Sequence, residues 1–314
     1  ASSRPNGQNV TRDDENDEWS REFSARRGLI VAPASGSCRG CAGNGCPCCA
    51  GTGRARRLIV SVDLRQIEPR WTAHLTRDPN LICVYKEDRD VYVEIGKIAF
   101  DIGHELDDKA WKKAYPDERQ AAKSIVLAIM YGAGTKKVAV MVREAGRQGI
   151  DGRIHAEKDE RARKELERKK AAFRFTDEDA LRVNARVEER FPSIFNYRDF
   201  LTRQYEAKGF IRNSFGRLLY LAYADKTYTL LNAMVQSSSA DMLKEATINC
   251  EAALRAAELD ANLIFSIHDS LLADCVASDA QATVRIMARE MTAFDLRVPL
   301  GAEAEVTASN MAEG

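Results

Sequence analysis

The chain is organised around residues 58–70, which read LIVSVDLRQIEPR. The apolar run 58–62 predicts a buried strand that ends at Asp63, and a polar turn then leads into a helix that carries Glu68. A strand that ends in Asp places a rigid anionic ligand at the edge of a sheet, where a hard metal ion can bind. The alternative is that Asp63 only caps the following helix. Whether Asp63 is a metal ligand or a helix cap depends on the residues found elsewhere in the chain.

Length and composition bound the class of protein. The 314 residues allow one large domain or two ordinary ones, and an apolar fraction of 45% supplies a core. Because 47 basic residues balance 47 acidic ones, a nucleic-acid interface has to come from local patches. The uncharged run 124–135 is 12 residues long, too short to cross a bilayer, and the polar N-terminus shows no signal peptide. We therefore expect no membrane contact and a reducing, cytoplasmic location.

A cysteine-rich stretch lies between two short apolar runs, 29–33 and 58–63, that both predict strands. It spans residues 38–53 and contains two copies of the pattern CxxCxGxG, eight residues apart. Two such pairs supply four thiolates, which suits tetrahedral zinc, and the glycines let the backbone turn around the sulfurs. A reduced Gly/Cys loop is the alternative, and Cys48 leaves the ligand set open. The predicted Zn²⁺ ligands are Cys38, Cys41, Cys46 and Cys49.

A second informative stretch is a predicted helix at residues 119–132, RQAAKSIVLAIMYG. Arg119, Lys123, Leu127 and Tyr131 recur every four residues, so they share one face of this helix. Two cations one turn apart near a helix N-terminus suit a phosphate group, because the side chains and the helix dipole act together. A solvated basic face is the alternative.

The remaining chain predicts mostly helices with one hairpin. His268 and Asp269 lie at the tip of the hairpin, between apolar strands at 263–269 and 271–275. A last strand is expected near 297–300, and an irregular or strand-like segment at 210–221. Asn232 and Gln236 share one face of a long helix and are candidates to contact one ligand, or are ordinary surface amides. Helices are expected at 64–77, 176–190, 192–209, 229–259 and 279–292, with two more before residue 119.

Residues 151–175 are unusually rich in charge, with nine basic and six acidic side chains. They predict an exposed helix, and their small basic excess is a candidate contact to a nucleic-acid backbone. Four pairs are spaced one turn apart for ion pairing: Glu157 with Arg161, Asp159 with Arg163, Glu160 with Lys164, and Glu165 with Lys169.

Asp63 and Asp269 lie some 200 residues apart, and each ends an apolar strand. If the two strands are neighbours in one sheet, their carboxylates can hold a pair of divalent ions for an in-line phosphoryl displacement. Mg²⁺ suits such a site, because it binds few carboxylates and keeps water and substrate phosphates as its other ligands. With Arg119 and Lys123 to neutralise a triphosphate, the combination indicates nucleotidyl transfer.

Six ordered segments carry a family resemblance. Their sequences are SRPNGQNV (3–10), DLRQIEPR (63–70), the stretch 119–132, FGR (215–217), VQSSSAD (235–241) and IHDS (267–270). This order resembles that of SxPNLQNIP, DYSQIELR, RRAAKxINFGxxYG, FGR, VQGTAAD and VHDE in the polymerase domain of family A DNA polymerases, those related to bacterial DNA polymerase I. The resemblance covers nearly the whole chain.

The resemblance implies a template-directed DNA polymerase that transfers dNMP from a dNTP to a primer 3′-hydroxyl with two Mg²⁺ ions. Asp63 and Asp269 would hold both metals, and Lys123 would donate a proton to the leaving pyrophosphate. Glu68 would crowd the sugar 2′ position. The implied nucleotide-binding residues are Leu64, Gln66, Glu68, Arg119, Lys123, Leu127 and Tyr131. The implied DNA contacts are Arg217, Asn232, Gln236 and His268.

The resemblance also implies an α+β fold, an antiparallel palm sheet backed by helices with a mostly helical fingers subdomain. The palm would comprise 1–79, including a zinc-knuckle insertion at 38–53 in a palm hairpin, and 211–314. The fingers would comprise 80–210, including a charged insertion at 151–175. Since no thumb or exonuclease segment is matched, we expect a fragment or a split polymerase in the cytoplasm of a bacterial or phage-infected cell. Expected partners are primer–template DNA, dNTP and a thumb-containing segment or subunit, with a processivity or replisome protein as a further candidate.

Six positions depart from the family pattern: Arg65 replaces Ser, Pro69 replaces Leu, Tyr92 replaces His, Leu127 replaces Phe or Tyr, Ala128 replaces Gly, and Ser270 replaces Glu. Two other classes of protein stay open. A single-subunit RNA polymerase shares the Asp pair and a related helix, but Gln-Ile-Glu at 66–68 argues against it. A catalytically silent polymerase-like scaffold, whose zinc module docks a partner, is opposed by the intact set of Asp63, Asp269, Arg119 and Lys123.

Overall fold

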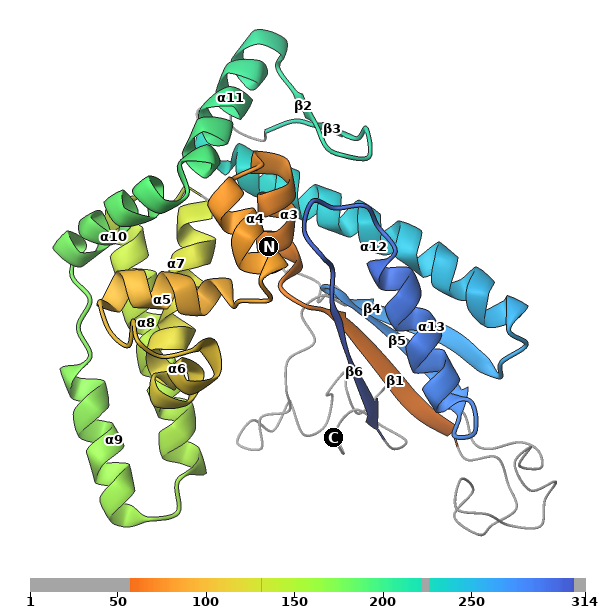
Figure 1. Cartoon of the computed structure of the whole chain (residues 1–314), viewed down its shortest axis with the longest axis horizontal. Helices are drawn as coiled ribbons and strands as arrows, with labels where there is room; N and C mark the ends of the chain where they lie inside the picture. Colours follow the sequence, from red (N-terminus) through yellow and green to blue (C-terminus); the bar gives the residue numbers. More distant parts are fainter. Residues whose placement is uncertain (1–56, 131, 222–225, 308–314) are drawn as a thin grey trace, which may run out of the picture. The chain divides into compact units, whose positions relative to one another are not determined.

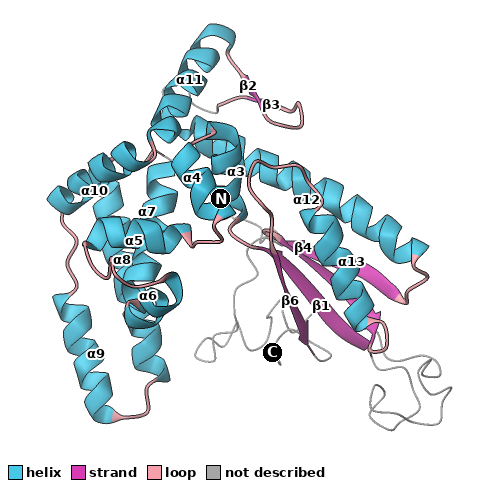
Figure 2. Cartoon of the chain, in the orientation of Figure 1, coloured by secondary structure: helices cyan, strands magenta, loops and turns pink. Residues whose placement is uncertain are grey.

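The computed structural model describes residues 57–130, 132–221 and 226–307, which form two compact units (Figure 1). Unit 1 lies within Ala1–Ile67, Ser239–Asp295 and Leu300–Gly314, and unit 2 within Glu68–Ser238 and Leu296–Pro299. As predicted, the fold class is α+β with an antiparallel sheet (Figure 2). Predictions for the strand at 29–33, the zinc ligands Cys38, Cys41, Cys46 and Cys49, and Tyr131 lie outside the described residues.

Unit 1 is built on a four-stranded sheet in the order β4-β5-β1-β6, in which every neighbouring pair is antiparallel. Val60 and Val62 are fully buried on one face of β1. Helix α13 packs against β1 and buries Met287 and Met291. The predicted strands 58–63, 263–269 and 271–275 are present, with ends that differ by up to two residues. The elements are β1 (Arg57–Leu64), β4 (Ala261–Ile267), β5 (Ser270–Val276), α13 (Ala280–Thr292) and β6 (Ala302–Thr307).

The prediction of a last strand at 297–300 is wrong, because the strand is β6 at Ala302–Thr307. Pro299 has no N–H to donate to a ladder, and its carbonyl accepts a hydrogen bond from Arg70 instead. The sequence of β6, AEAEVT, contains mainly good helix formers, so its strand character comes from pairing with β1 along residues 59–64.

Unit 2 consists mainly of helices, and three of them lie between α3 and α7, where two were predicted. Local signals set several helix ends: Asp78 caps α4 ahead of Pro79, and Gly209 ends α11 with a φ of 75°. Helix α3 starts in unit 1, and α12 continues from unit 2 into unit 1. The elements are α3 (Ile67–Thr76), α4 (Pro79–Lys86), α5 (Val91–Phe100), α6 (Asp108–Ala114), α7 (Pro116–Met130), α8 (Thr135–Ala156), α9 (Glu160–Ala172), α10 (Asp177–Arg190), α11 (Pro192–Lys208), β2 (Ile211–Arg212), β3 (Leu218–Leu219), the 3₁₀ turn η3 (Thr227–Thr229) and α12 (Leu230–Ala256).

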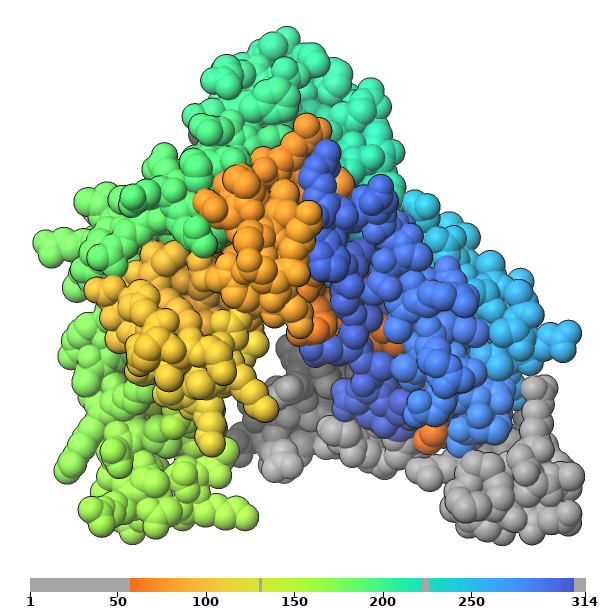
Figure 3. Space-filling model, viewed as in Figure 1, coloured from red at the N-terminus to blue at the C-terminus, as the bar shows by residue number. Residues whose placement is uncertain are grey.

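The charged stretch 151–175 is divided between the end of α8 and α9, rather than one continuous helix. The break occurs where Asp159 accepts a hydrogen bond from the backbone N–H of Ala162 and so caps a new helix. The predicted exposure is confirmed, because α9 has no buried residue and lies at the surface of unit 2 (Figure 3).

The ion pairs predicted along this stretch form only in part. Lys164 and Glu160 are 2.8 Å apart, as predicted. Lys169 contacts Asp117 on α7 at 2.7 Å rather than Glu165, so the prediction of that pair is wrong. The buried Asp117 is fixed and desolvated, whereas an exposed helical neighbour offers only a weak, solvated contact.

No helix within the described ranges is long and apolar enough to cross a membrane.

Candidate functional site

Asp63 is the second-last residue of β1, a strand that lies between β5 and β6 in the unit 1 sheet. It lies directly opposite Ser270 of β5 on one side and Glu303 of β6 on the other. Because both neighbours pair with β1, the backbone of Asp63 is fixed on two sides. Its side chain is only half-buried, so the carboxylate remains accessible where β1 ends, at one end of the strands of the sheet.

Asp269 is brought to the same edge by the β4–β5 hairpin. Ile267 pairs with Ser270, which leaves His268 and Asp269 as a two-residue turn, as predicted. His268 adopts a φ of 54°, a left-handed conformation that allows so tight a turn. The N–H of Leu64 donates to the carbonyl of Asp269 at 3.2 Å. The structure thus joins the ends of two strands that lie 200 residues apart in the sequence.

Ser270 contacts Asp63 directly. Its hydroxyl donates to Oδ1 of Asp63 at 2.6 Å, a short bond of the kind that a charged acceptor favours. Among the described residues, no hydrogen bond reaches Oδ2 of Asp63, which leaves that oxygen for another ligand. The bond therefore orients the carboxylate and leaves one of its oxygens available.

Gln66 and Glu68 follow this edge in sequence but are placed differently. Gln66 belongs to unit 1 and has a φ of 51°, which forms the turn out of β1. Glu68 belongs to unit 2, in the first turn of α3, and its carbonyl accepts a hydrogen bond from Thr72. The left-handed turn at Gln66 ends β1 and lets α3 begin one residue later.

Arg119 and Lys123 lie on one face of α7, as predicted, within unit 2. The guanidinium of Arg119 is not simply solvated, because Nη2 is 2.8 Å from Oδ2 of Asp90. Lys112 of α6 contacts the same oxygen at 2.8 Å. Asp90 is 5% exposed and also caps α5 through the N–H of Tyr92. Burial alone would raise the pKa of Asp90, but hydrogen bonds from Lys112 and Arg119 outweigh it and hold the pKa below its usual range.

Tyr92 lies beside both cations of this face. The guanidinium carbon of Arg119 is 5.7 Å from the ring centre of Tyr92, and Nζ of Lys123 is 5.9 Å from it. Burial, and then the charge of Arg119, lower the pKa of Lys123 below the usual lysine range. An ammonium group with a lowered pKa, half-buried beside a second cation, is suited to bind an anion and to give up a proton.

The end of α7 is fixed by a close backbone approach. Leu127 is partly exposed on the face of Arg119 and Lys123. Gly132 has a φ of 69°, and a Cβ at this position would lie 2.7 Å from the carbonyl oxygen of Tyr228. Only glycine fits such a contact with φ in this range, so α7 ends at a tightly packed turn.

The predicted DNA contacts are distributed over both units. Arg217 lies on the exposed β2–β3 turn, which Asn213 closes by accepting bonds from the N–H groups of Phe215 and Arg217. This turn contacts α12, where the hydroxyl of Ser238 accepts a bond from the N–H of Ser214. Asn232 and Gln236 follow on α12. Gln236 is exposed, and the buried Oδ1 of Asn232 has no partner among the described residues. His268 is exposed on the unit 1 hairpin.

Three carboxylates near the candidate residues were not predicted from the sequence, and one of them, Asp90, contacts a candidate residue directly. They are Asp90 at Arg119, Glu303 beside Asp63, and the buried Asp117 at the start of α7. The only local signal for Asp90 was its position two residues before Tyr92, as a helix cap. The other two contacts depend on segments remote in sequence.

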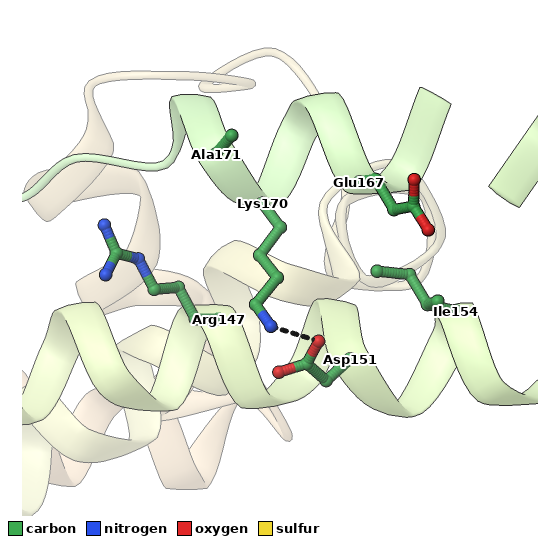
Figure 4. Close-up of a pocket in the computed structure, with 6 residues that line it drawn as sticks. All are labelled: Arg147, Asp151, Ile154, Glu167, Lys170 and Ala171. Carbon is green, nitrogen blue, oxygen red and sulfur yellow. Dashed lines mark hydrogen bonds and ion pairs between the residues drawn. The ribbon is translucent and has the colours of Figure 1, made fainter. Parts of the chain in front are cut away.

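Asp117 connects α7 to the charged hairpin of α8 and α9. Its Oδ2 accepts hydrogen bonds from Arg153 of α8 and Lys169 of α9, both at 2.7 Å. On the hairpin itself, Lys170 of α9 bonds Asp151 of α8 beside a shallow hollow of about 470 Å³ (Figure 4). The hairpin is thus attached to the first turn of the helix that carries Arg119 and Lys123.

Comparisons with known proteins agree on one family. A model described as DNA polymerase family A matches residues 1–149 and 162–312, with a gap at the junction of α8 and α9. DNA polymerase I of Bacillus caldotenax is 27% identical over 255 residues, covering 77% of this chain and 24% of that protein. The thermostable DNA polymerase I of Thermus aquaticus is 25% identical over 256 residues, covering 78% of this chain and 26% of that protein. The chain spans about a quarter of the length of these relatives.

A solved structure agrees in fold. The POL domain of Pol1 from M. smegmatis, in complex with DNA primer-template and dNTP, matches with a TM-score of 0.68 and 21% sequence identity. The match covers 98% of this chain and 45% of that chain.

Proposed function

Because the chain belongs to DNA polymerase family A, we propose that it carries out template-directed DNA synthesis, the transfer of dNMP from a dNTP to a primer 3′-hydroxyl. One observation carries the proposal: the β1–β5 pairing brings Asp63 and Asp269 to the same edge of one sheet. Two fixed, accessible carboxylates at a sheet edge are what phosphoryl transfer with divalent metals requires.

The residues at this edge fit magnesium. Both side chains are oxygen donors, both are half-buried, and Oδ2 of Asp63 accepts no hydrogen bond from the described residues. Mg²⁺ prefers this kind of site, with one or two carboxylates, water and substrate phosphates. Asp63 and Asp269 would hold two ions, with the carbonyl of Leu64 as a further ligand. When bound, Mg²⁺ supplies charge stabilisation of the attacking and leaving oxygens.

The remaining residues bind and orient the substrates. Arg119 and Lys123 neutralise the triphosphate, and Lys123 donates a proton to the leaving pyrophosphate. Glu68 excludes a 2′-hydroxyl from the nucleotide site. Gln66, Leu127 and Tyr131 line the nucleotide, and the nucleic acid is contacted by Arg217, Asn232, Gln236 and His268. Catalysis follows from positioning and charge neutralisation, because phosphoryl transfer needs little covalent participation by the protein.

The proposal also covers the division of the chain into subdomains, a zinc ion and the macromolecules that the chain binds. We assign the palm to 1–79 and 211–314, and the fingers to 80–210. A thumb-containing segment or subunit completes the grip on primer–template DNA. A zinc ion on Cys38, Cys41, Cys46 and Cys49 would organise residues 38–53. A replisome protein is a candidate partner.

Primer extension tests the proposal. The chain, supplied with a thumb-containing segment, should extend a primer with dNTP and Mg²⁺, whereas Asp63→Asn and Asp269→Asn should reduce the rate by at least about a thousandfold. Unchanged thermal midpoints of both variants would show that folding is preserved. Equal product from wild type and Asp269→Asn would reject the proposal. With rNTP in place of dNTP, wild type should extend poorly, and Glu68→Ala should relax that discrimination.

A further inference from the structure

Asp90 shares one carboxylate oxygen between two cations. Nζ of Lys112 and Nη2 of Arg119 each lie 2.8 Å from Oδ2 of Asp90. The other oxygen, Oδ1, accepts a hydrogen bond from the N–H of Tyr92 at 2.9 Å. Because both cations contact the same atom, their nitrogens lie within about 6 Å of each other, where like charges repel. All of these residues belong to unit 2.

Helix α6 places Lys112 at this carboxylate through contacts that do not involve α7. Trp111, the residue before Lys112, is fully buried and fixes the helix in the core of unit 2. One turn before Lys112, Oδ2 of Asp108 accepts a hydrogen bond from the backbone N–H of Asp90 at 2.6 Å. Helix α6 therefore holds Asp90 at two points, by its backbone and by its side chain.

The contact of Arg119 with Asp90 conflicts with the role proposed for this arginine. A guanidinium that neutralises a triphosphate has to give its N–H groups to phosphate oxygens. In the structure Nη2 is given to Asp90, whose side chain is 5% exposed. Breaking a buried ion pair is strongly unfavourable when the carboxylate loses its counter-charge. A pair of Asp90 and Arg119 alone would therefore hold the guanidinium back from a phosphate.

Lys112 removes this conflict. When the guanidinium of Arg119 turns to a phosphate, Lys112 still balances the charge of Asp90. The exchange also relieves the repulsion between the two cations. In addition, Nε of Arg119 is buried and has no hydrogen-bond partner within the described ranges, so the guanidinium does not use all of its donors where it lies. An unsatisfied buried donor lowers the cost of leaving this position.

We propose that Lys112 is a positioning residue of the nucleotide site: it keeps Asp90 neutralised while Arg119 exchanges this carboxylate for a phosphate of the nucleoside triphosphate. The inference rests on the proposed function, because it assumes that Arg119 binds the triphosphate. It adds a residue that lies outside the motifs of the family resemblance. It also explains how an arginine that contacts a buried carboxylate can bind the substrate.

Binding of inorganic triphosphate to the full chain tests the inference. Without divalent metal, this probe addresses the cations of α7 and not Asp63 and Asp269. Isothermal titration calorimetry compares wild type, Lys112→Met, Asp90→Asn and the double variant, each well below its thermal midpoint. Lys112→Met should weaken binding at least about tenfold, because Arg119 then has to leave a buried carboxylate that no lysine balances. In the Asp90→Asn background the same change should weaken binding no more than about threefold, since no carboxylate holds Arg119.

Lys113 supplies a matched control. It is the next residue of α6 and is exposed. Lys113→Met removes the same charge from the same helix and should weaken binding no more than about threefold in both backgrounds. Lys112→Arg keeps a cation at Asp90 and should bind within about threefold of wild type. A purely structural role of Lys112 would lower the thermal midpoint of Lys112→Met without making the loss of binding depend on Asp90.

Two outcomes separate this inference from the proposed function. If Lys112→Met has the same effect in both backgrounds, or no larger effect than Lys113→Met, then Lys112 does not act through Asp90 and the inference alone is rejected. If wild type binds inorganic triphosphate no better than Arg119→Ala, the proposed phosphate site is rejected, and the inference is rejected with it.

Discussion

The hydroxyl of Ser270 donates to Oδ1 of Asp63 at 2.6 Å, across the pairing of β5 with β1. Ser270 directly follows Asp269, so one hairpin both supplies the second carboxylate and orients the first. A family A polymerase with glutamate at this position would place a negative charge beside Asp63, whereas Ser270 supplies a neutral donor.

Replacing Ser270 tests this orienting bond. A hydrogen bond to a charged group contributes about 1.5–3 kcal/mol, so Ser270→Ala should slow primer extension about tenfold by letting Asp63 rotate. Ser270→Thr keeps the hydroxyl and should retain most of the rate. The thermal midpoints of the two variants should differ by no more than about 5 °C, the shift that the loss of one such bond produces in a chain of this length. Equal rates for the Ala and Thr variants would show that the bond does not orient Asp63.

Lys123 should determine the alkaline limb of the pH–rate profile. The pKa of Lys123 lies below the usual lysine range, chiefly because the ammonium is half-buried and secondly because Arg119 is close. A proton donor works in its protonated form, so single-turnover rates should fall as pH rises through this lowered pKa.

Lys123→Arg provides the comparison for this limb. Arginine stays protonated throughout, so the variant should lose the alkaline limb and react about a hundredfold more slowly. Lys137→Arg, at an exposed position of α8, should leave the profile unchanged. A profile of Lys123→Arg parallel to that of wild type would exclude Lys123 as the donor.

Asp90→Asn should destabilise unit 2 in a pH-dependent way. Asp90 is buried with two cations, so losing its charge should lower the free energy of unfolding by about 3 kcal/mol near pH 7. Its pKa is lower in the folded chain than in the unfolded chain, so this stabilisation is complete above the ordinary aspartate range and is lost as pH falls through the folded value.

Urea unfolding at several pH values measures this effect. The difference between wild type and Asp90→Asn should shrink as pH falls below about 4. Asp88→Asn is the matched control: Asp88 is exposed and has a φ of 52°, which Asn tolerates, so stability should change by less than about 0.5 kcal/mol. A constant difference across the pH range would show that the charge of Asp90 is not what stabilises the site.

Asp117→Asn should loosen the α8–α9 hairpin. Asp117 is 1% exposed and holds Arg153 and Lys169, both of which can return to water when it is neutralised. We expect a loss of about 1–3 kcal/mol and faster hydrogen exchange in residues 150–175. Glu165→Gln should have no such effect, because Lys169 pairs with Asp117 and not with Glu165. Faster exchange in both variants would contradict the assignment of Asp117 as the anchor.

Features with local causes could be predicted from the sequence. The start of α11 at Pro192 and its end at Gly209 are encoded within the segment, since proline suits a first turn and glycine a left-handed end. The strand before Asp63 and the hairpin at His268 and Asp269 were predicted for the same reason: an apolar run next to polar turn residues is a short-range signal.

Features that depend on distant segments could not be predicted in this way. Strand β6 has helix-forming residues and becomes a strand only by pairing with β1. Lys169 has a suitably spaced partner in its own helix, yet it contacts a buried carboxylate on α7, because desolvation strengthens that contact.

The same division applies to the candidate site. Side-chain chemistry and local periodicity, which can be read from the amino-acid sequence, establish which residues carry charge and on which strand or helix each charge lies. Which side chains meet depends on the tertiary structure: Ser270 contacts Asp63, Asp90 contacts Arg119, and Glu303 contacts Arg65. Strand register and helix packing set these distances, and the strength of a charge interaction depends on distance and burial.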